Sequence, residues 1–180
     1  DPYAEQICAA TPAKVISYAM NTKADIHPIE TSFNLNGTKA QLQFGQTELV
    51  IDSGLVGKYN LLNIMAASAV SMDMGIPSQD IEQAINSLPP IPGRLEQVPC
   101  NCPGKVFIDY AHTPDAYEKL FSTLSTLKNE KDKIITVFGC GGDRDATKRN
   151  TMAKISEAYA AFSFVTMDNP RTESLDQIND

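Results

Sequence analysis

The second half of this chain alternates short apolar runs with longer amphipathic segments, and that alternation limits the possible folds more than any other feature. Strands are predicted at residues 105–109, 133–138 and 162–167, with helices at 113–127, at 148–160 and after Thr172. Consecutive strands joined by helices pack into a parallel sheet through right-handed crossovers. We therefore expect an α/β domain with a parallel sheet in this half.

The first half of the chain shows a different pattern. Polar and apolar residues alternate between Ile26 and Asp52, and the turn signals Asn36-Gly37 and Gly45-Gln46 predict antiparallel hairpins. The other expected elements are a helix at 4–10, a strand at 14–18, a helix at 60–74 ended by Gly75, and a helix capped by Ser78 with Ile81, Ala84, Ile85 and Leu88 on one face.

The segment "PPIPGR", residues 89–94, separates these two patterns. Two prolines followed by Pro-Gly cannot continue a helix and favour a stiff, extended connection. We place a domain boundary here. Residues 1–88 are then one domain, residues 89–94 a linker and residues 95–180 a second domain.

Composition excludes some classes of function. The 180 residues include 15 basic and 22 acidic side chains, for a net charge of −7. Such a balance argues against binding to nucleic acid or to an anionic membrane. No apolar run reaches the about eighteen residues that a membrane-spanning helix needs. We expect no nucleic-acid or membrane partner.

The four cysteines, Cys8, Cys100, Cys102 and Cys140, lack the spacing of a zinc site. We expect all four to be free thiols in a reducing compartment. The segment "VPCNCPG" that contains Cys100 and Cys102 is predicted to form a hairpin turn before the first strand of the second domain.

Polar residues follow each strand of the second domain, in the loops "DYAHTPD" (109–115), "GCGGDRD" (139–145) and "DNPRTE" (168–173). In open parallel sheets, ligands bind beyond the carboxyl ends of the strands. Capping of the following helices explains Thr113 and some acidic residues, but it does not explain two loop arginines. The sequence therefore predicts a ligand site at this edge.

The 139–145 loop is rich in glycine, yet it matches neither the Walker A pattern nor the dinucleotide pattern, because Arg144 stands where each requires glycine. Asp143 and Asp145 flank this arginine. A guanidinium suits a carboxylate, and the aspartates could orient it or receive an ammonium group, so the loop suits an amino acid. Arg171 offers a second guanidinium, and Asn169 can both donate and accept. The alternative is a structural Arg–Asp network.

Asn60 and Asn63 are three residues apart at the start of a predicted helix and so share one face. Carboxamides suit the edge of a base such as adenine. The alternative is that Asn60 caps the helix and Asn63 is an ordinary surface residue.

The segments "GKYNLLNIMAASAV", "PGRLE", "DYAHTPD", "FGCGGDRD" and "DNPRTE" together resemble the Mur ligase family in order and spacing. The resemblance covers nearly the whole chain. It implies that residues 1–88 are the C-terminal part of a central ATP-binding domain. Residues 95–180 would then be the first half of a Rossmann-like, amino-acid-binding C-terminal domain. "DNPR" resembles the motif by which one branch of the family recognises meso-diaminopimelate.

The resemblance also implies roles for individual residues. Those expected to bind the nucleotide are Asn60, Asn63, Arg94, Asp109, Tyr110 and His112, with His112 in a positioning role. Those expected to bind diaminopimelate are Arg144, Asp168, Asn169, Pro170 and Arg171. No catalytic residue and no metal ligand is implied between residues 1 and 180.

The implied activity is that of an ATP-dependent ligase of peptidoglycan synthesis, a cytoplasmic process that supports cell shape and division. With ATP and Mg²⁺ as cofactors, it would join meso-diaminopimelate to UDP-N-acetylmuramoyl-L-alanyl-D-glutamate through an acyl phosphate. The family's phosphate loop and magnesium ligands do not occur in this sequence, so we expect a fragment that is inactive by itself. Two alternatives are a related ligase that adds L-lysine or glutamate, and a non-catalytic module that binds an amino acid or a nucleotide.

Overall fold

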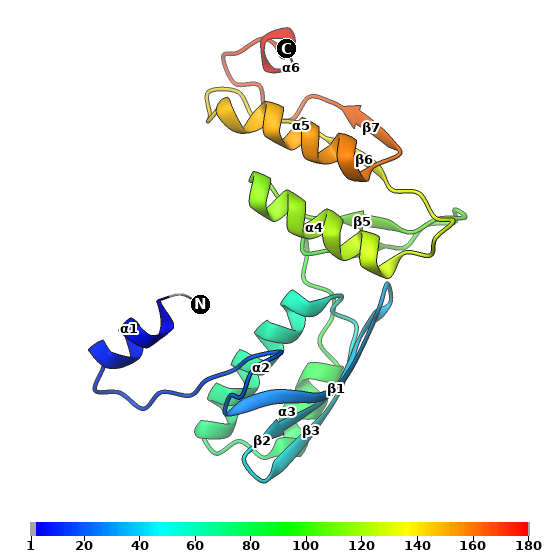
Figure 1. Ribbon diagram of the computed structural model, residues 1–180. Coiled ribbons are helices and arrows are strands. Elements are labelled where there is room, and N and C mark those ends of the chain that lie inside the picture. The colour runs from blue at the N-terminus through cyan, green and yellow to red at the C-terminus, as the bar shows by residue number, and fades with distance from the viewer. Residues whose placement is uncertain (1–2, 180) are drawn as a thin grey trace. The chain divides into compact units, whose positions relative to one another are not determined.

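The computed structural model describes residues 3–179. The chain divides into two compact units, Asp1–Pro89 and Pro90–Asp180. The chain contains both helices and strands, including a parallel strand pair in the second unit, which confirms the predicted α/β class (Figure 1).

The first unit contains a three-stranded antiparallel sheet in the order β1-β2-β3. Its strands are β1 (Ile26–Asn34), β2 (Gly37–Phe44) and β3 (Thr47–Ser53). Both predicted turns are present, and Gly45 has the positive φ of 59° that glycine adopts most readily. Side chains of β3 alternate between buried and exposed positions, as expected when one face of a sheet covers a core.

Three helices complete the first unit: α1 (Ala4–Ala10), α2 (Lys58–Asp73) and α3 (Ser78–Asn86). The main core is formed by β1–β3 and α2; its fully buried side chains are Ile26, Leu42, Leu49, Leu61 and Met65. Gly75, with φ 79°, follows the C-terminal end of α2 as predicted.

Two local predictions for this unit were wrong. Residues 14–18 do not form a strand; only Tyr18 makes an isolated bridge, to Ile26. Ser78 does not cap α3, because it lies within the helix and Pro77 occupies the cap position without a side-chain hydrogen bond. The apolar face predicted for α3 was right only in part: Ile81 is buried, but Ala84 and Leu88 are exposed, and Leu88 lies beyond the end of the helix.

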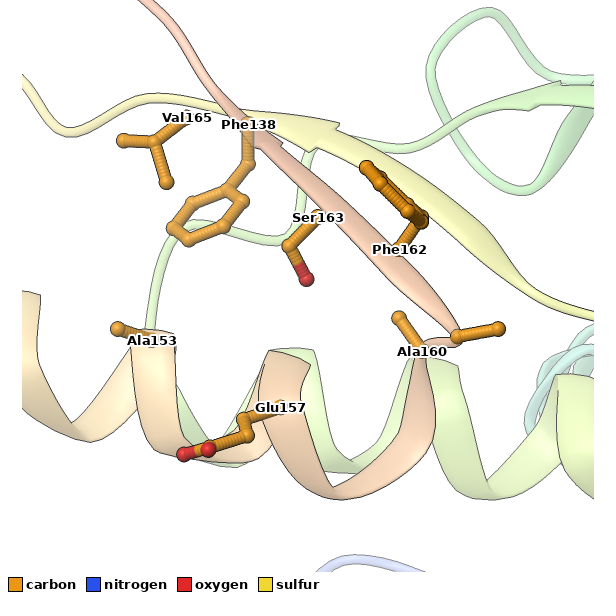
Figure 2. Close-up of a pocket in the computed structure, with 8 residues that line it drawn as sticks. Phe138, Ala153, Glu157, Ala160, Phe162, Ser163 and Val165 are labelled. Carbon is orange, nitrogen blue, oxygen red and sulfur yellow. The ribbon is translucent and has the colours of Figure 1, made fainter.

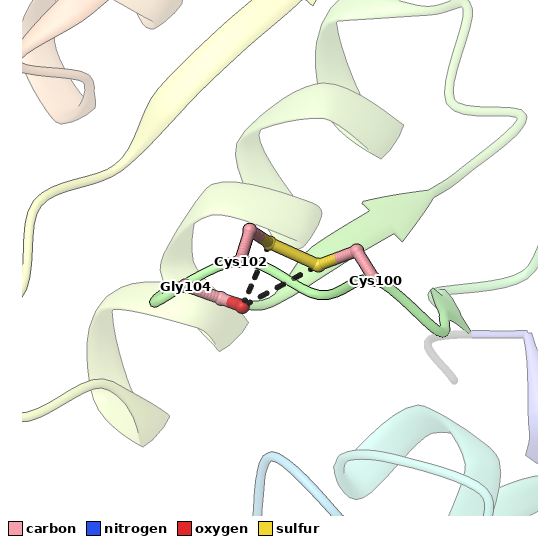
Figure 3. The surroundings of a disulfide bond; sticks show 3 residues. All are labelled: Cys100, Cys102 and Gly104. Carbon is pink, nitrogen blue, oxygen red and sulfur yellow. Dashed lines mark hydrogen bonds between the residues drawn. A yellow bond between two sulfur atoms is a disulfide. The ribbon is translucent and has the colours of Figure 1, made fainter.

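The second unit begins with an antiparallel hairpin of β4 (Glu96–Val98) and β5 (Val106–Ile108). The turn between them confirms the predicted hairpin. Cys100 and Cys102 are joined there by a disulfide, and the sulfurs of both lie near the Gly104 carbonyl (Figure 3). The expectation of four free thiols was therefore wrong for this pair, since the turn brings the two side chains together; Cys8 and Cys140 are free.

The remaining strands, β6 (Ile135–Phe138) and β7 (Phe162–Val165), form a parallel pair. The helices of this unit are α4 (Pro114–Leu127), α5 (Thr147–Tyr159) and α6 (Leu175–Asn179). Their core contains Tyr117, Phe121, Cys140, Met152 and Ile178. Thr113 caps α4 as predicted, because its hydroxyl accepts a hydrogen bond from the Ala116 amide.

The predicted parallel sheet is present for β6 and β7 but not for β5. Within the described residues β5 pairs only with β4, in a separate two-stranded sheet. The hairpin satisfies the hydrogen-bonding groups of β5 locally, and the Tyr110 amide continues this pairing by donating to the Gly93 carbonyl at 2.8 Å.

Candidate functional site

The loops that follow β6 and β7 lie against each other. The pairing of the two strands continues beyond their ends, since the Thr166 amide donates to the Phe138 carbonyl at 2.8 Å. Further along, the Gly142 amide donates to the Asn169 carbonyl at 2.9 Å. Arg171 Nη1 donates to the Gly142 carbonyl at 2.6 Å. The two predicted loops, 139–145 and 168–173, thus form one surface.

Close backbone contact explains the glycines of the 139–145 loop. A Cβ atom at Gly142 would lie 1.9 Å from the Pro170 carbonyl oxygen, and one at Gly139 would lie 2.2 Å from the Thr166 carbonyl oxygen. Real side chains do not tolerate such distances. These glycines therefore let one loop approach the other, and a phosphate is not needed to account for them.

The two aspartates beside Arg144 hold the backbone rather than the arginine. Asp143, at φ 51°, accepts hydrogen bonds from both the amide and the hydroxyl of Thr172. Asp145 accepts from the amide and the hydroxyl of Thr147 at the start of α5. These hydrogen bonds lower the pKa of both carboxyls below the ordinary value, so both are ionised at neutral pH.

Arg144 itself remains free. Its side chain is exposed and makes no hydrogen bond or ion pair with any residue between 3 and 179. The left-handed backbone of Asp143 and the hydrogen bonds on either side fix the peptide that carries it. The backbone that carries Arg144 is therefore fixed. Its guanidinium has no partner among the described residues and can bind a carboxylate of a ligand.

Arg171 has a divided role. Its backbone is also left-handed, with φ 53°, and its Nη1 is occupied by the Gly142 and Asn169 carbonyls. Asp168 and Asn169 are exposed on the same loop, and Pro170 is partly buried beneath the Gly142 backbone. All five residues predicted to bind diaminopimelate therefore lie on two contacting loops.

Sequence reasoning missed an ion pair below these loops. Arg149, in the first turn of α5, lies with Nη1 2.8 Å from Glu173 Oε2 and with Nη2 3.0 Å from Glu173 Oε1. The Glu173 carboxylate also accepts the Asp143 amide at 2.6 Å. Hydrogen bonds from Arg149, and next from the Asp143 amide, lower the pKa of Glu173. The sequence offered one signal that Arg149 faces the protein interior. It lies three and seven residues before Met152 and Ser156, so it shares a helical face with these buried residues.

The loop after β5 carries three of the six residues predicted to bind the nucleotide: Asp109, Tyr110 and His112. Asp109 Oδ2 accepts the Leu95 amide at 2.7 Å and Oδ1 accepts the Ala111 amide at 2.8 Å. This carboxylate thereby fixes the segment next to Arg94, whose side chain is exposed.

Two rings stand on the same loop. The ring of Tyr110 is 67% exposed and lies edge-on to His112, with 5.1 Å between ring centroids. His112 Nδ1 is 2.9 Å from the Tyr110 carbonyl, which sets its ring orientation. An exposed ring on this loop and the exposed Arg94 guanidinium, whose segment Asp109 fixes, suit a nucleotide. A ring face can stack on a base or sugar, and a guanidinium can bind phosphate.

Asn60 and Asn63 belong to the first unit. Asn60 Nδ2 donates to the Val56 carbonyl at 2.9 Å, which holds the turn before α2, where Gly57 occupies the cap position with φ 91°. Asn60 is thus not the cap residue, and Asn63 is exposed one turn later.

The second unit also has a hollow of about 290 Å³ between α5 and the strands β6 and β7. Figure 2 shows Phe138, Phe162 and Val165 opposite Ala153 and Ala160 around it. Its lining is mainly apolar and includes none of the predicted site residues. Among residues 3–179, no group of three or more histidine, cysteine or acidic side chains could hold a metal ion. No described helix is both long and apolar enough to cross a membrane.

Comparisons with known proteins identify the family of this chain. Residues 1–71 match the Mur ligase middle domain, and residues 93–180 match the Mur ligase glutamate ligase domain. The UDP-N-acetylmuramoyl-L-alanyl-D-glutamate–2,6-diaminopimelate ligase of Chlamydia pneumoniae is 41% identical over 179 residues, which are 98% of this chain and 36% of that protein. The ligase of the same name from Nostoc sp. is also 41% identical, over the whole chain and 37% of its own length.

Solved structures show the same fold. A structure described as UDP-N-acetylmuramoyl-L-alanyl-D-glutamate–2,6-diaminopimelate ligase superposes with a TM-score of 0.66 at 31% identity, covering 98% of this chain and 37% of the other. Folylpolyglutamate synthase of Mycobacterium tuberculosis, complexed with ADP, has a TM-score of 0.63 at 22% identity, covering 86% of this chain and 34% of the other, and shows the fold alone. The chain thus spans little more than a third of these relatives. The chain belongs to the Mur ligase family.

Proposed function

We propose that this chain is part of an ATP-dependent ligase that joins meso-diaminopimelate to UDP-N-acetylmuramoyl-L-alanyl-D-glutamate in peptidoglycan synthesis. The observation that carries the proposal is the contact between the 139–145 and 168–173 loops. Arg144 is exposed on the loop that contacts Asn169 and Arg171, and it has no partner among residues 3–179. The names of the relatives described above support the choice of substrates. The activity would belong to the longer protein, because the chain spans 36% of its relative from Chlamydia pneumoniae.

In the proposed reaction, the γ-phosphoryl group of ATP moves to a carboxylate oxygen of D-glutamate, and ADP leaves. The amine of the incoming amino acid then attacks the acyl carbon, and the tetrahedral intermediate collapses to an amide with loss of phosphate and a proton. Positioning of two reactants in this way can lower a barrier by ~7–11 kcal/mol. The task of the second unit would therefore be to hold the amine in line with the acyl carbon.

Several of the predicted residues have a direct role in this proposal. Arg144 would bind one carboxylate of the amino acid, and the part of the Arg171 guanidinium not used by Gly142 would bind another. Asp168 and Asn169 would receive an ammonium group. Tyr110, His112 and Arg94 of the second unit would contact the nucleotide.

Mg²⁺ would neutralise charge on the phosphates. Residues 3–179 contain no cluster suited to a metal, so residues elsewhere in the longer protein would hold this ion.

The test is phosphate release by the full-length ligase with ATP, Mg²⁺ and the UDP-linked dipeptide. One reaction contains meso-diaminopimelate and the other L-lysine, and both are repeated with Arg171→Ala. We expect turnover on diaminopimelate alone and its loss in the variant, because lysine has no distal carboxylate for an arginine to bind. Equal turnover on lysine would contradict the substrate assignment. Release with neither amino acid would contradict the ligase function.

A further inference from the structure

Two adjacent residues of α5, Lys148 and Arg149, reach two different predicted sites. Lys148 Nζ donates to the His112 carbonyl at 2.7 Å, in the loop after β5. Arg149 Nη2 donates to the Gly141 carbonyl at 3.3 Å and pairs with Glu173, in the loops after β6 and β7. Consecutive helical residues point in directions about 100° apart, so neighbouring side chains can contact separate loops. One helical turn thus connects three loops.

The Arg149 side chain is unusually enclosed for a charged group. It is only 13% exposed, and its Nε is buried without a hydrogen-bond partner among the described residues. Burying a donor without an acceptor has a free-energy cost. An apolar side chain of similar size would avoid that cost, so stability alone is a poor reason for arginine at this position.

Arg149 holds neighbouring groups in fixed positions. Its two terminal nitrogens hold both oxygens of Glu173, and that carboxylate in turn accepts the Asp143 amide. Asp143 directly precedes Arg144. The ion pair therefore fixes the peptide that presents Arg144, and it fixes it relative to the segment that contains Arg171.

Lys148 provides the corresponding tie on the other side. The carbonyl that it binds belongs to His112, whose ring contacts Tyr110. Burial raises the pKa of the Cys140 thiol, and the nearby Lys148 ammonium partly opposes that rise. Hydrogen bonds from Thr147 lower the pKa of Asp145, and the same ammonium adds to that effect. The loop predicted to hold the nucleotide and the loops predicted to hold the amino acid are thus attached to adjacent residues.

We propose that Lys148 and Arg149 are positioning residues that set the distance between the nucleotide loop and the amino-acid loops. The proposal rests on the proposed ligase function and assigns no contact with a substrate to either residue. Arg149 holds the amino-acid loops and Lys148 holds the nucleotide loop. Loss of either residue therefore misplaces its own loop and weakens binding of that loop's ligand, although no direct contact with a ligand is removed.

The test uses the full-length ligase and four variants: Lys148→Met, Arg149→Met, Arg149→Lys and, as a matched control on the exposed part of α5, Lys154→Met. KM is measured separately for ATP and for meso-diaminopimelate, together with kcat and the thermal unfolding midpoint. Arg149→Met should raise KM for diaminopimelate roughly tenfold, because Glu173 loses its partner and no longer holds the Asp143 amide beside Arg144. KM for ATP should stay unchanged in that variant. Lys148→Met should show the opposite selectivity, and Lys154→Met should behave as wild type.

Arg149→Lys keeps the charge and should recover part of the lost affinity for diaminopimelate. If Arg149→Met raised both KM values equally, or raised neither, the positioning role would be refuted. Equal effects of Lys154→Met and Lys148→Met would refute it as well. Absence of turnover in the wild-type enzyme on any amino acid would instead refute the underlying ligase function, so the two failures are distinguishable.

Discussion

The Gly142 backbone lies directly against Pro170, so close that a Cβ atom on the glycine would stand 1.9 Å from the proline carbonyl oxygen. The contact joins the loop that carries Arg144 to the loop that carries Arg171. The arrangement of the candidate site depends on this contact between the two loops.

Substitution of Gly142 by alanine should separate the two loops. Overpacking of this kind typically costs about 1–3 kcal/mol, so we expect a lower thermal unfolding midpoint and weaker binding of the amino acid. The control is Gly104→Ala in the β4–β5 turn, where an added Cβ would meet nothing within 4 Å. Equal behaviour of the two variants in a thermal shift assay would show that the loops do not need this contact.

Acid should weaken the same loops. Hydrogen bonds from Thr172 lower the pKa of Asp143, so this carboxyl stabilises the fold above its ordinary pKa, and the contribution is lost as pH falls through the lowered value. Asp143→Asn should therefore reduce the unfolding midpoint at pH 7 and have little effect at acid pH, below both pKa values. Asparagine is the appropriate replacement, since it tolerates the left-handed backbone at this residue. A reduction of the same size at every pH between 3 and 7 would contradict this explanation.

The cap of α4 offers a separate test of stability. Removal of the Thr113 hydroxyl should cost about 1 kcal/mol, because the Ala116 amide loses its acceptor. Thr126→Ala on the same helix is the control, since its hydroxyl only donates to the Ser122 carbonyl one turn back. Thermal unfolding of both variants should show a clear loss for Thr113→Ala alone; no difference between them would rule out the capping role.

The Cys100–Cys102 disulfide encloses a very short segment. The chain-entropy model then gives a stabilisation of only about 1.6 kcal/mol, so the double variant to serine should keep its fold with a small loss of stability. The bond itself is checked by alkylation and peptide mapping. Without reductant the peptide from this turn should stay unmodified, and after reduction it should carry two labels. Two labels without reductant would show that both cysteines are thiols.

Short-range patterns predicted much of the secondary structure. The turns at Gly37 and Gly45 and the cap at Thr113 depend on a few neighbouring residues, and the sequence contained those residues. The partner of β5 depends instead on which distant strand competes for its edge, and periodicity carries no such information. The sequence therefore indicated a strand near residue 107 but placed it in the wrong sheet.

The site was predictable to a similar extent. Topology alone placed Arg144 and Arg171 at one edge, because loops after parallel strands meet there. The roles of Asp143 and Asp145 were not predictable, since each carboxylate could bind either the arginine or a nearby amide. Only the structure shows that both bind threonines. The disulfide was missed for a related reason, as the spacing of two cysteines does not determine whether a turn brings their side chains together.

The most direct measurement is a crystal structure of the full-length ligase with meso-diaminopimelate bound. We predict that the amino acid lies over the 139–145 and 168–173 loops, with one carboxylate within about 2.7–2.9 Å of the Arg144 guanidinium. An amino acid bound elsewhere, with Arg144 still facing solvent, would contradict the account.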